Sequence, residues 1–255
     1  MILSHLRRDI TALLTEAKIE DASSVARYLI CDMMSFSTTE MLMLDRDEVA
    51  SDVCDRLLKE AHRLADGEPL QYVTGRAYFH GNDFYVAPGV LIPRPETEEL
   101  VDLVLEKGRG KRVLDIGTGS GCIAISLKLS NADLDVTSVD VSADALVIAQ
   151  KNASILEAGV TFMQQDILDM NANIGQYDIV VSNPPYICDK EKADMKANVL
   201  NHEPHIALFV PDSDPLLFYR TIAERCCHGM LTDQVSSFLR LMRHIRMRHV
   251  RCSHL

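Results

Sequence analysis

Residues 112–129 read RVLDIGTGSGCIAISLKL, an apolar run that passes through glycines and small residues into a helical pattern. This order is typical of a strand, a tight turn and a helix. Gly117, Gly119 and Gly121 let the backbone turn sharply and let a ligand approach closely. The dinucleotide fingerprint G-x-G-x-x-G does not fit, because Cys122 stands where its third glycine belongs. We expect a site for another nucleoside cofactor here; a plain strand-to-helix connection is the alternative.

Similar strand-like runs follow this segment along the chain. They are DVTSVD (135–140), VTFMQQD (160–166) and YDIVVSNPPY (177–186), and the segment SADALVIAQKNASILEA (142–158) has helical periodicity. Alternating strands and helices predict βαβ units with right-handed crossovers, and therefore a mostly parallel sheet. The near-continuous apolar character of these strands fits a sheet that is covered on both faces. The fold class is therefore α/β.

The amino-terminal part has a different pattern. Between residues 3 and 65 apolar residues recur at helical spacing, and charged residues fill the other face. This pattern predicts a small bundle of amphipathic helices. We expect Asp21, Ser37 and Asp45 to be N-caps that divide it, and Gly67 to end the last helix.

A connector should join the bundle to the α/β region. Residues 75–92 place aromatic residues on both sides of Gly81-Asn82-Asp83, which is the pattern of a β-hairpin. The expected organisation is a helical domain (1–70), a hairpin linker (71–92), an α/β domain (93–227) and an atypical basic tail (228–255).

Composition and charge restrict the class of protein. The chain has 255 residues, 47% of them hydrophobic and 25% charged, which is close to the average of globular proteins. The net charge of −11 argues against a protein that binds nucleic acid through its overall charge. We expect neither a membrane span nor a secretory signal, because no apolar run approaches about 20 residues. The seven cysteines contain no CxxC pair, so we expect reduced thiols in the cytoplasm, with no disulfide and no metal site.

Two acidic residues stand at strand ends. Asp140 ends the second strand, where its carboxylate can accept both hydroxyls of a ribose. Capping of the next helix is its alternative role, although Ser142 can serve as that cap. Asp166 closes the third strand, where it and the following backbone N–H could hold an adenine edge while Ile167 covers the ring. A simple strand-ending turn is the alternative for Asp166.

The most specific pattern is Asn183-Pro184-Pro185-Tyr186 at the end of the fourth strand. Two prolines cannot continue a central strand, so the chain must leave the sheet there. The Asn183 side chain and the Pro184 carbonyl each offer an acceptor, and Tyr186 offers a flat face. Together they could hold a planar NH2 group so that its nitrogen faces an electrophile. A mere strand stop would need the prolines alone.

Five segments together resemble the PrmC/HemK family of protein-(glutamine-N5) methyltransferases. They are GEPLQYVTG (67–75), LIPRPETE (91–98), VLDIGTGSGCIAI (113–125), SVDVS (138–142) and VSNPPYI (181–187). The resemblance implies an N-terminal helical domain and a class I, Rossmann-like methyltransferase domain that uses S-adenosylmethionine. The implied substrate is the glutamine of the Gly-Gly-Gln loop in a peptide chain release factor.

The resemblance also implies roles for individual residues. Those implied to bind the cofactor are Asp115, Gly117, Thr118, Gly119, Ser120, Gly121, Asp140, Val141, Asp166, Ile167 and Asn183. Those implied to hold the substrate are Asn183, Pro184, Pro185, Tyr186, Arg94 and Glu96, of which Asn183, Pro184 and Tyr186 would be catalytic. A salt bridge at the start of a helix is the alternative for Arg94. Glu203-Pro204 matches a further element of the family.

The carboxyl-terminal tail departs from the family pattern. The family continues with a strand of the type G-G-x-L-x-x-E-I-G, of which Gly229 and Leu231 are all that fit here. Apolar residues from Val235 to Val250 recur at helical spacing among Arg and His, so one amphipathic basic helix is expected. It would bind RNA or a membrane surface, or it is unrelated sequence that replaces the native end. Replacement would leave the strand YDIVVS with an open edge.

Other functions remain open from the sequence. An N6-adenine methyltransferase acting on nucleic acid is one alternative, and a non-catalytic binding module with an incomplete sheet is another. An NAD-dependent oxidoreductase fits the glycine spacing less well. For the methyltransferase we expect a monomer that acts on a release factor in the cytoplasm, without direct contact to nucleic acid or membrane.

Overall fold

The computed structural model describes residues 1–107, 111–239 and 249–250. Two compact units are present. The first comprises Met1–Gly75 with Lys196–His202, and the second comprises Arg76–Met195 with the chain from Glu203 onward. The sequence did not indicate that Lys196–His202 groups with the first unit. Within the described residues, every helix is too short or too polar to cross a membrane.

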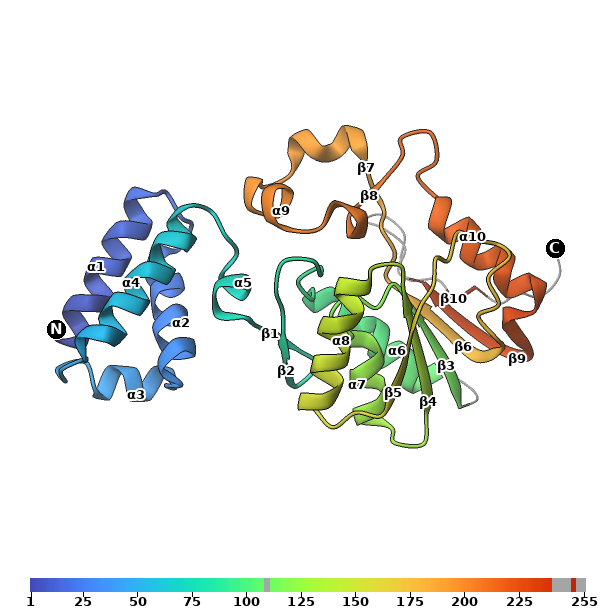
Figure 1. The fold of residues 1–255 in the computed structure, drawn as a ribbon, viewed down its shortest axis with the longest axis horizontal. Helices are drawn as coiled ribbons and strands as arrows, with labels where there is room; N and C mark the ends of the chain where they lie inside the picture. Colours follow the sequence, from blue (N-terminus) through green and yellow to red (C-terminus); the bar gives the residue numbers. More distant parts are fainter. Residues whose placement is uncertain (108–110, 240–248, 251–255) are drawn as a thin grey trace. The chain divides into compact units, whose positions relative to one another are not determined.

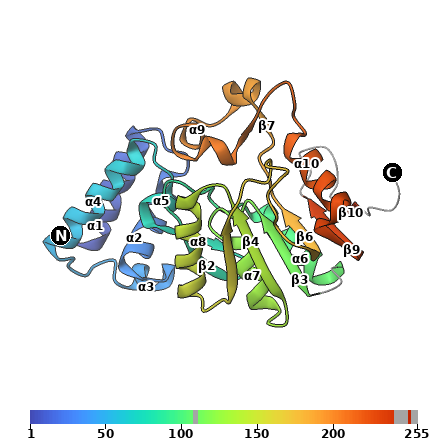
Figure 2. The same cartoon turned by 45° about the vertical axis from the view of Figure 1, so that its right-hand side comes forward.

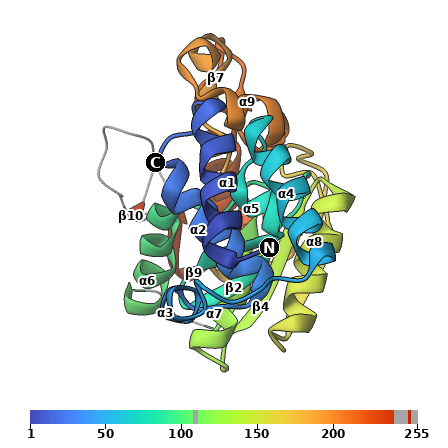
Figure 3. The same ribbon diagram turned by 90° about the vertical axis from the view of Figure 1, so that its left-hand side faces the viewer.

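The first unit is a helical bundle, as the periodicity predicted (Figure 3). Its helices are α1 (Leu3–Glu16), α2 (Ala22–Met34), α3 (Thr38–Met43), α4 (Ser51–Ala65), α5 (Leu70–Thr74) and α9 (Ala197–His202). The α1 residues Leu6, Ile10 and Leu14 lie one turn apart and are fully buried, and they share a core with Leu57 and Ala61 of α4. Burial of such side chains contributes roughly 1.5–3 kcal/mol each, which stabilises the bundle.

The predicted caps of this bundle were partly correct. Ser37 caps α3 in a capping box with Glu40, whose backbone N donates to Ser37 Oγ at 3.1 Å. Asp21 precedes α2 in the left-handed region, with φ of 49°, and does not serve as the expected side-chain cap. The prediction for Asp45 was wrong, because α4 begins at Ser51. Asp45 instead accepts a hydrogen bond from Arg7 at 2.9 Å, and this ion pair ties it to α1.

The second unit opens with the predicted hairpin and continues with the predicted α/β fold (Figures 1 and 2). The hairpin pairs β1 (Arg76–Phe79) with β2 (Asn82–Tyr85). The main sheet has the order β10-β9-β6-β3-β4-β5. Its parallel strands are β3 (Arg112–Ile116), β4 (Asp135–Asp140), β5 (Val160–Gln164), β6 (Tyr177–Ser182) and β9 (Leu231–Leu239), and β10 (His249–Val250) runs antiparallel. Two short strands, β7 (Ile187–Cys188) and β8 (Phe209–Val210), pair separately.

Helices cover both faces of this sheet. They are α6 (Glu98–Lys107), α7 (Cys122–Ser130), α8 (Ala143–Ile155) and α10 (Leu217–Arg225). The alternation of side chains along β3 shows how the faces differ, because Val113 packs in the core with α6 and α7, whereas Leu114 packs in the core with α10. Both residues are fully buried. The strands are apolar on both faces for this reason, and their carboxyl ends meet at one edge of the sheet.

The tail prediction was wrong where the structure describes the tail. Leu231–Leu239 forms β9, a strand and not a helix, and it pairs with β6. The edge of β6 is therefore not open: Ile179 is in register with Ser236, with an irregularity between Tyr177 and Ile179. The exposed N–H and C=O groups of an apolar strand edge favour pairing with any available extended segment, and this outweighs a helical pattern. The remainder of the expected helix, residues 240–248, lies outside the described residues.

Candidate active site

The glycine-rich turn follows β3 and is fixed to the end of β4. Gly117, Gly119 and Gly121 all have positive φ values, of 75°, 53° and 82°. The backbone N of Gly117 donates to the Val139 carbonyl at 2.8 Å, and Gly119 N donates to Asp140 Oδ2 at 2.9 Å. Glycine is needed at these positions because other residues adopt positive φ at a cost of about 1–2 kcal/mol. The turn is thereby held in one conformation.

The Asp140 carboxylate stabilises the local backbone and still has acceptor capacity for a ligand. Its Oδ1 accepts from Ser142 N at 2.9 Å, while Ser142 Oγ accepts from Ala145 N and caps α8, as predicted for Ser142. Asp140 also lines the pocket described below. A carboxylate has about four lone-pair sites, and the two backbone donors use two of them. The remaining acceptor capacity can serve hydroxyl groups of a ligand.

Asp115 lies beneath the glycine-rich turn. It is fully buried, and its Oδ2 accepts from Ser138 Oγ at 2.7 Å. Burial raises the pKa of the Asp115 carboxyl to about 6, since the charged form is disfavoured away from water. Asp115 does not line the pocket. We infer that it supports the turn and does not contact a ligand directly.

The turn nevertheless presents polar groups to the pocket. Thr118 Oγ1 and Ser120 Oγ are buried and line the pocket, and neither has a hydrogen-bond partner within 3.5 Å among the described residues. Both hydroxyls lie near a buried group whose pKa they lower, Asp115 for Thr118 and Cys122 for Ser120. An unpaired buried hydroxyl costs about 1–3 kcal/mol, so these two groups favour a bound polar ligand. Gly121 does not line the pocket. A Cβ at Gly121 would lie 2.9 Å from Ile125 Cδ1 and 3.2 Å from Ala149 Cβ, so this glycine permits close packing of the turn on α8.

Asp166 and Ile167 lie just beyond β5 and both line the pocket. Asp166 Oδ1 accepts from Leu168 N at 2.9 Å, so the residue forms the strand-ending turn that was one of its two possible roles. Its other carboxylate oxygen is left for a ligand. Ile167 is 7% exposed and contributes an apolar surface next to it.

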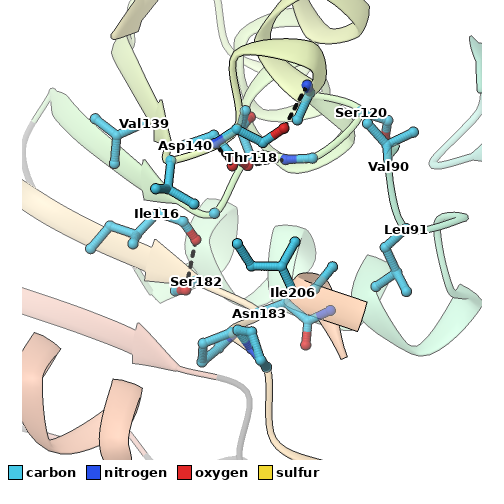
Figure 4. A pocket seen from close by; sticks show the side chains of 18 of the residues that line it. Val90, Leu91, Ile116, Thr118, Ser120, Val139, Asp140, Ser182, Asn183 and Ile206 are labelled. Carbon is cyan, nitrogen blue, oxygen red and sulfur yellow. Dashed lines mark hydrogen bonds between the residues drawn. The ribbon is translucent and has the colours of Figure 1, made fainter. Parts of the chain in front are cut away.

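The Asn183–Pro185 corner leaves the sheet directly after β6. Ser182 Oγ donates to the Ile116 carbonyl at 2.7 Å and ties the ends of β6 and β3 together. The Asn183 amide donates from Nδ2 to Thr97 Oγ1 at 3.4 Å, whereas its Oδ1 is buried without a partner among the described residues. Asn183 therefore presents an acceptor that a ligand N–H can use. Figure 4 shows Asn183 across the pocket from Thr118 and Asp140.

Two residues of the predicted substrate site lie elsewhere. Tyr186 and Glu96 are not among the residues that line the pocket. Tyr186 packs at the edge of the core that contains Ile222 and Val180, and its backbone N donates to the Leu208 carbonyl at 3.3 Å. The Tyr186 side chain is thus engaged with this core and does not line the cavity.

Arg94 lines the pocket and is held by a buried carboxylate. Its Nη2 donates to Glu203 Oε1 at 2.5 Å, and Glu203 Oε2 accepts from Ile92 N at 3.1 Å. The Glu203 side chain is 1% exposed. The ion pair proposed as an alternative for Arg94 is thus present, although its partner is distant in sequence. A buried glutamate requires such partners, and the sequence had indicated Glu203 only through its match to an element of the family.

One cavity of about 250 Å³ is lined by the turn residues 117–120 together with Arg94, Asp140, Asp166, Ile167 and Asn183 (Figure 4). Sequence reasoning missed part of its lining, namely Val90, Leu91, Thr97, Ile206, Ala207 and Phe218. Val90 and Leu91 are apolar residues between Pro88 and Pro93, a pattern that could have indicated a rigid wall. Ile206 and Phe218 carry no comparable signal, because tertiary folding alone brings them to this edge of the sheet.

Comparison with known proteins supports one family. The family described as "PrmC N-terminal domain" matches residues 5–75, and the family described as "Methyltransferase small domain" matches residues 96–206. A release factor glutamine methyltransferase of Bacteroides thetaiotaomicron is 50% identical over 80% of this chain and 74% of its own length. The protein of the same name from Bacillus subtilis is 40% identical over 83% of this chain and 75% of its own length. The chain therefore belongs to the release factor glutamine methyltransferase family.

Proposed function

We propose that this protein transfers a methyl group from S-adenosylmethionine to the side-chain amide nitrogen of a glutamine in a peptide chain release factor, within its Gly-Gly-Gln loop. The observation that carries the proposal is the buried Asn183 Oδ1, which has no hydrogen-bond partner among the described residues and lies across a cavity from the glycine-rich turn. Membership of the family supports the same activity, because its relatives are named for it.

The residues present suit the cofactor. Asp140 would accept hydrogen bonds from the ribose, Asp166 and Ile167 would hold the adenine, and Thr118 and Ser120 would bind polar groups near the turn. The glycines have no side chains, so they leave room for a ligand to approach the backbone of the turn. When bound, S-adenosylmethionine supplies an electrophilic methyl group on a positively charged sulfur.

The contribution of Asn183 follows from the chemistry of an amide. An amide nitrogen is a poor nucleophile because its lone pair is delocalised into the carbonyl. Asn183 Oδ1 and the Pro184 carbonyl would each accept a hydrogen bond from one N–H of the substrate amide. This would orient the nitrogen lone pair toward the methyl group. Orientation of this kind can supply up to about 7–11 kcal/mol of the barrier. No general base is required before transfer, because the amide nitrogen would release one proton to water only after it has accepted the methyl group. Stacking by Tyr186 remains a sequence-based prediction.

Methylation of a purified release factor tests the proposal. The enzyme is incubated with release factor and S-adenosylmethionine carrying a labelled methyl group, and the modified residue is located by mass spectrometry. We expect label on the glutamine nitrogen, and a loss of at least 100-fold in rate for Asn183→Ala, in line with removal of one positioning group. Asn131→Ala is the matched control, since Asn131 is exposed at the end of α7 and outside the pocket.

The same experiment separates the alternatives. Label that appears in DNA or RNA and not in protein would favour an N6-adenine methyltransferase. Absence of label, together with cofactor affinity weaker than about 1 mM, would favour a non-catalytic module. Action as a monomer in the cytoplasm is part of the proposal, and size-exclusion chromatography with light scattering tests the oligomeric state.

A further inference from the structure

Arg225 is a buried cation at the end of α10. The residue is 7% exposed. Its guanidinium donates to three backbone carbonyls of the loop between β5 and β6: Nε to Ile167 at 2.9 Å, Nη1 to Ala172 at 3.1 Å, and Nη2 to Asp169. Burial of a guanidinium is costly unless its donors are satisfied, and these charge-assisted bonds satisfy them.

The three carbonyls belong to one compact loop. Asp169 N donates to the Asp166 carbonyl at 3.1 Å, and Ala172 N donates to the Asp169 carbonyl at 3.0 Å, so the loop consists of consecutive turns. Ile167 and Ile174 of this loop are buried in the core beside Tyr219 and Ile222 of α10, and Arg225 adds an anchor for the loop backbone. The planar fork of one arginine reaches all three carbonyls at once, which a lysine cannot do.

This loop also forms part of the pocket wall. Asp166, Ile167 and Leu168 line the cavity, and the first carbonyl that Arg225 binds is that of Ile167 itself. Arg225 is not among the lining residues, so it acts on the pocket through the loop. A displacement of the Ile167 backbone would move the Asp166 carboxylate with it.

We propose that Arg225 is a positioning residue that fixes the base-recognition wall of the cofactor site, Asp166–Leu168, and so determines the selectivity for adenine. This inference rests on the proposed function. In it the free Asp166 oxygen accepts a hydrogen bond from the adenine amino group. Hypoxanthine presents an oxygen at that position, which would face the carboxylate and be repelled.

Binding of two cofactor products tests this role without requiring turnover. Calorimetry on the full chain measures the affinity for S-adenosylhomocysteine and for S-inosylhomocysteine. We expect the wild type to prefer the adenine compound strongly. Arg225→Met should lower the affinity for S-adenosylhomocysteine at least tenfold and should reduce the preference for adenine over hypoxanthine. The matched control is Arg220→Met, since Arg220 is a half-exposed arginine on the same helix that pairs with Asp214.

Arg225→Lys is the control for a general loss of folding in Arg225→Met. It keeps the charge and should show a smaller loss of affinity and of base preference than Arg225→Met. Unchanged affinity in both Arg225 variants would overturn the inference. An equal loss for both compounds, with the base preference intact, would also overturn it, because Arg225 would then support the fold alone. A wild type that binds neither compound would instead reject the proposed function.

Discussion

Glu203 and Arg94 lie 109 positions apart in the chain and form an ion pair of 2.5 Å at the wall of the pocket. The carboxylate is buried, while the arginine side chain is 32% exposed. Glu203 also accepts a hydrogen bond from Ile92 N, so one side chain anchors both the backbone and the side chain of the segment that precedes α6. This segment includes Thr97, which contacts Asn183.

Removal of the Glu203 carboxylate should destabilise the second unit. Glu203→Ala leaves the Ile92 N–H without its acceptor, and the expected loss in the free energy of unfolding is about 1–3 kcal/mol. Glu203→Gln keeps an acceptor for Ile92 and should lose less. Urea unfolding of the two variants and the wild type measures the difference. Equal stability of Glu203→Ala and wild type would contradict the anchoring role.

Thr97 should set the orientation of the Asn183 amide. Thr97→Val removes the hydroxyl that accepts from Asn183 Nδ2 while it preserves shape, so the amide can rotate and present Nδ2 to the substrate. We expect kcat for glutamine methylation to fall about tenfold, equivalent to about 1.4 kcal/mol, with little change in the KM for the cofactor. Thr97→Ser keeps the hydroxyl and should retain most activity. Equal rates for the two variants would argue against this role.

Gly121 should tolerate substitution less well than Gly119. Gly121→Ala introduces a Cβ into the contacts with Ile125 and Ala149 at a positive φ, and overpacking of this kind costs roughly 1–3 kcal/mol. At Gly119 the added Cβ meets nothing within 4 Å, so Gly119→Ala should carry the cost of positive φ alone, about 1–2 kcal/mol. Thermal unfolding of both variants tests this order. If Gly121→Ala were more stable than Gly119→Ala, Ile125 and Ala149 would have to be able to move away from the turn.

The buried Asp115 should make stability depend on pH. Its pKa is raised from 3.8 to about 6 by burial, so the folded state holds a proton that the unfolded state has released. This stabilising contribution is complete below pH 3.8 and is lost as the pH rises through about 6. Relative to wild type, Asp115→Asn should therefore gain up to about 3 kcal/mol between pH 4 and pH 7.

Unfolding by urea at a series of pH values measures this linkage. Ser138→Ala provides a companion variant, because loss of its hydrogen bond removes a group that lowers the Asp115 pKa, and the loss of stability with pH should then extend to higher pH. A difference between Asp115→Asn and wild type that stays constant from pH 4 to pH 7 would show that Asp115 is ionised in the folded protein throughout.

Local patterns predicted much of the fold and part of the site. The glycines after β3 and the prolines after β6 mark chain reversals that few other residues allow, so their place at strand ends could be read directly. Parallel topology then brought Asp140, Asp166 and Asn183 to the same edge of the sheet. Tyr186 does not line this pocket, because the direction of the chain after two prolines depends on what it packs against. Its contact with the substrate remains a prediction from the sequence.

The sequence by itself determined the alternation of strands and helices, the helical bundle and the sharp turns, because these depend on periodicity and on backbone sterics within a few residues. Tertiary structure alone decided the pairing of Glu203 with Arg94, the three carbonyls bound by Arg225, and the extended form of Leu231–Leu239. Each of these satisfies a buried polar group or an open strand edge with a partner far along the chain. A polar group needs a partner of this kind only after the chain has folded and water no longer hydrogen-bonds to it.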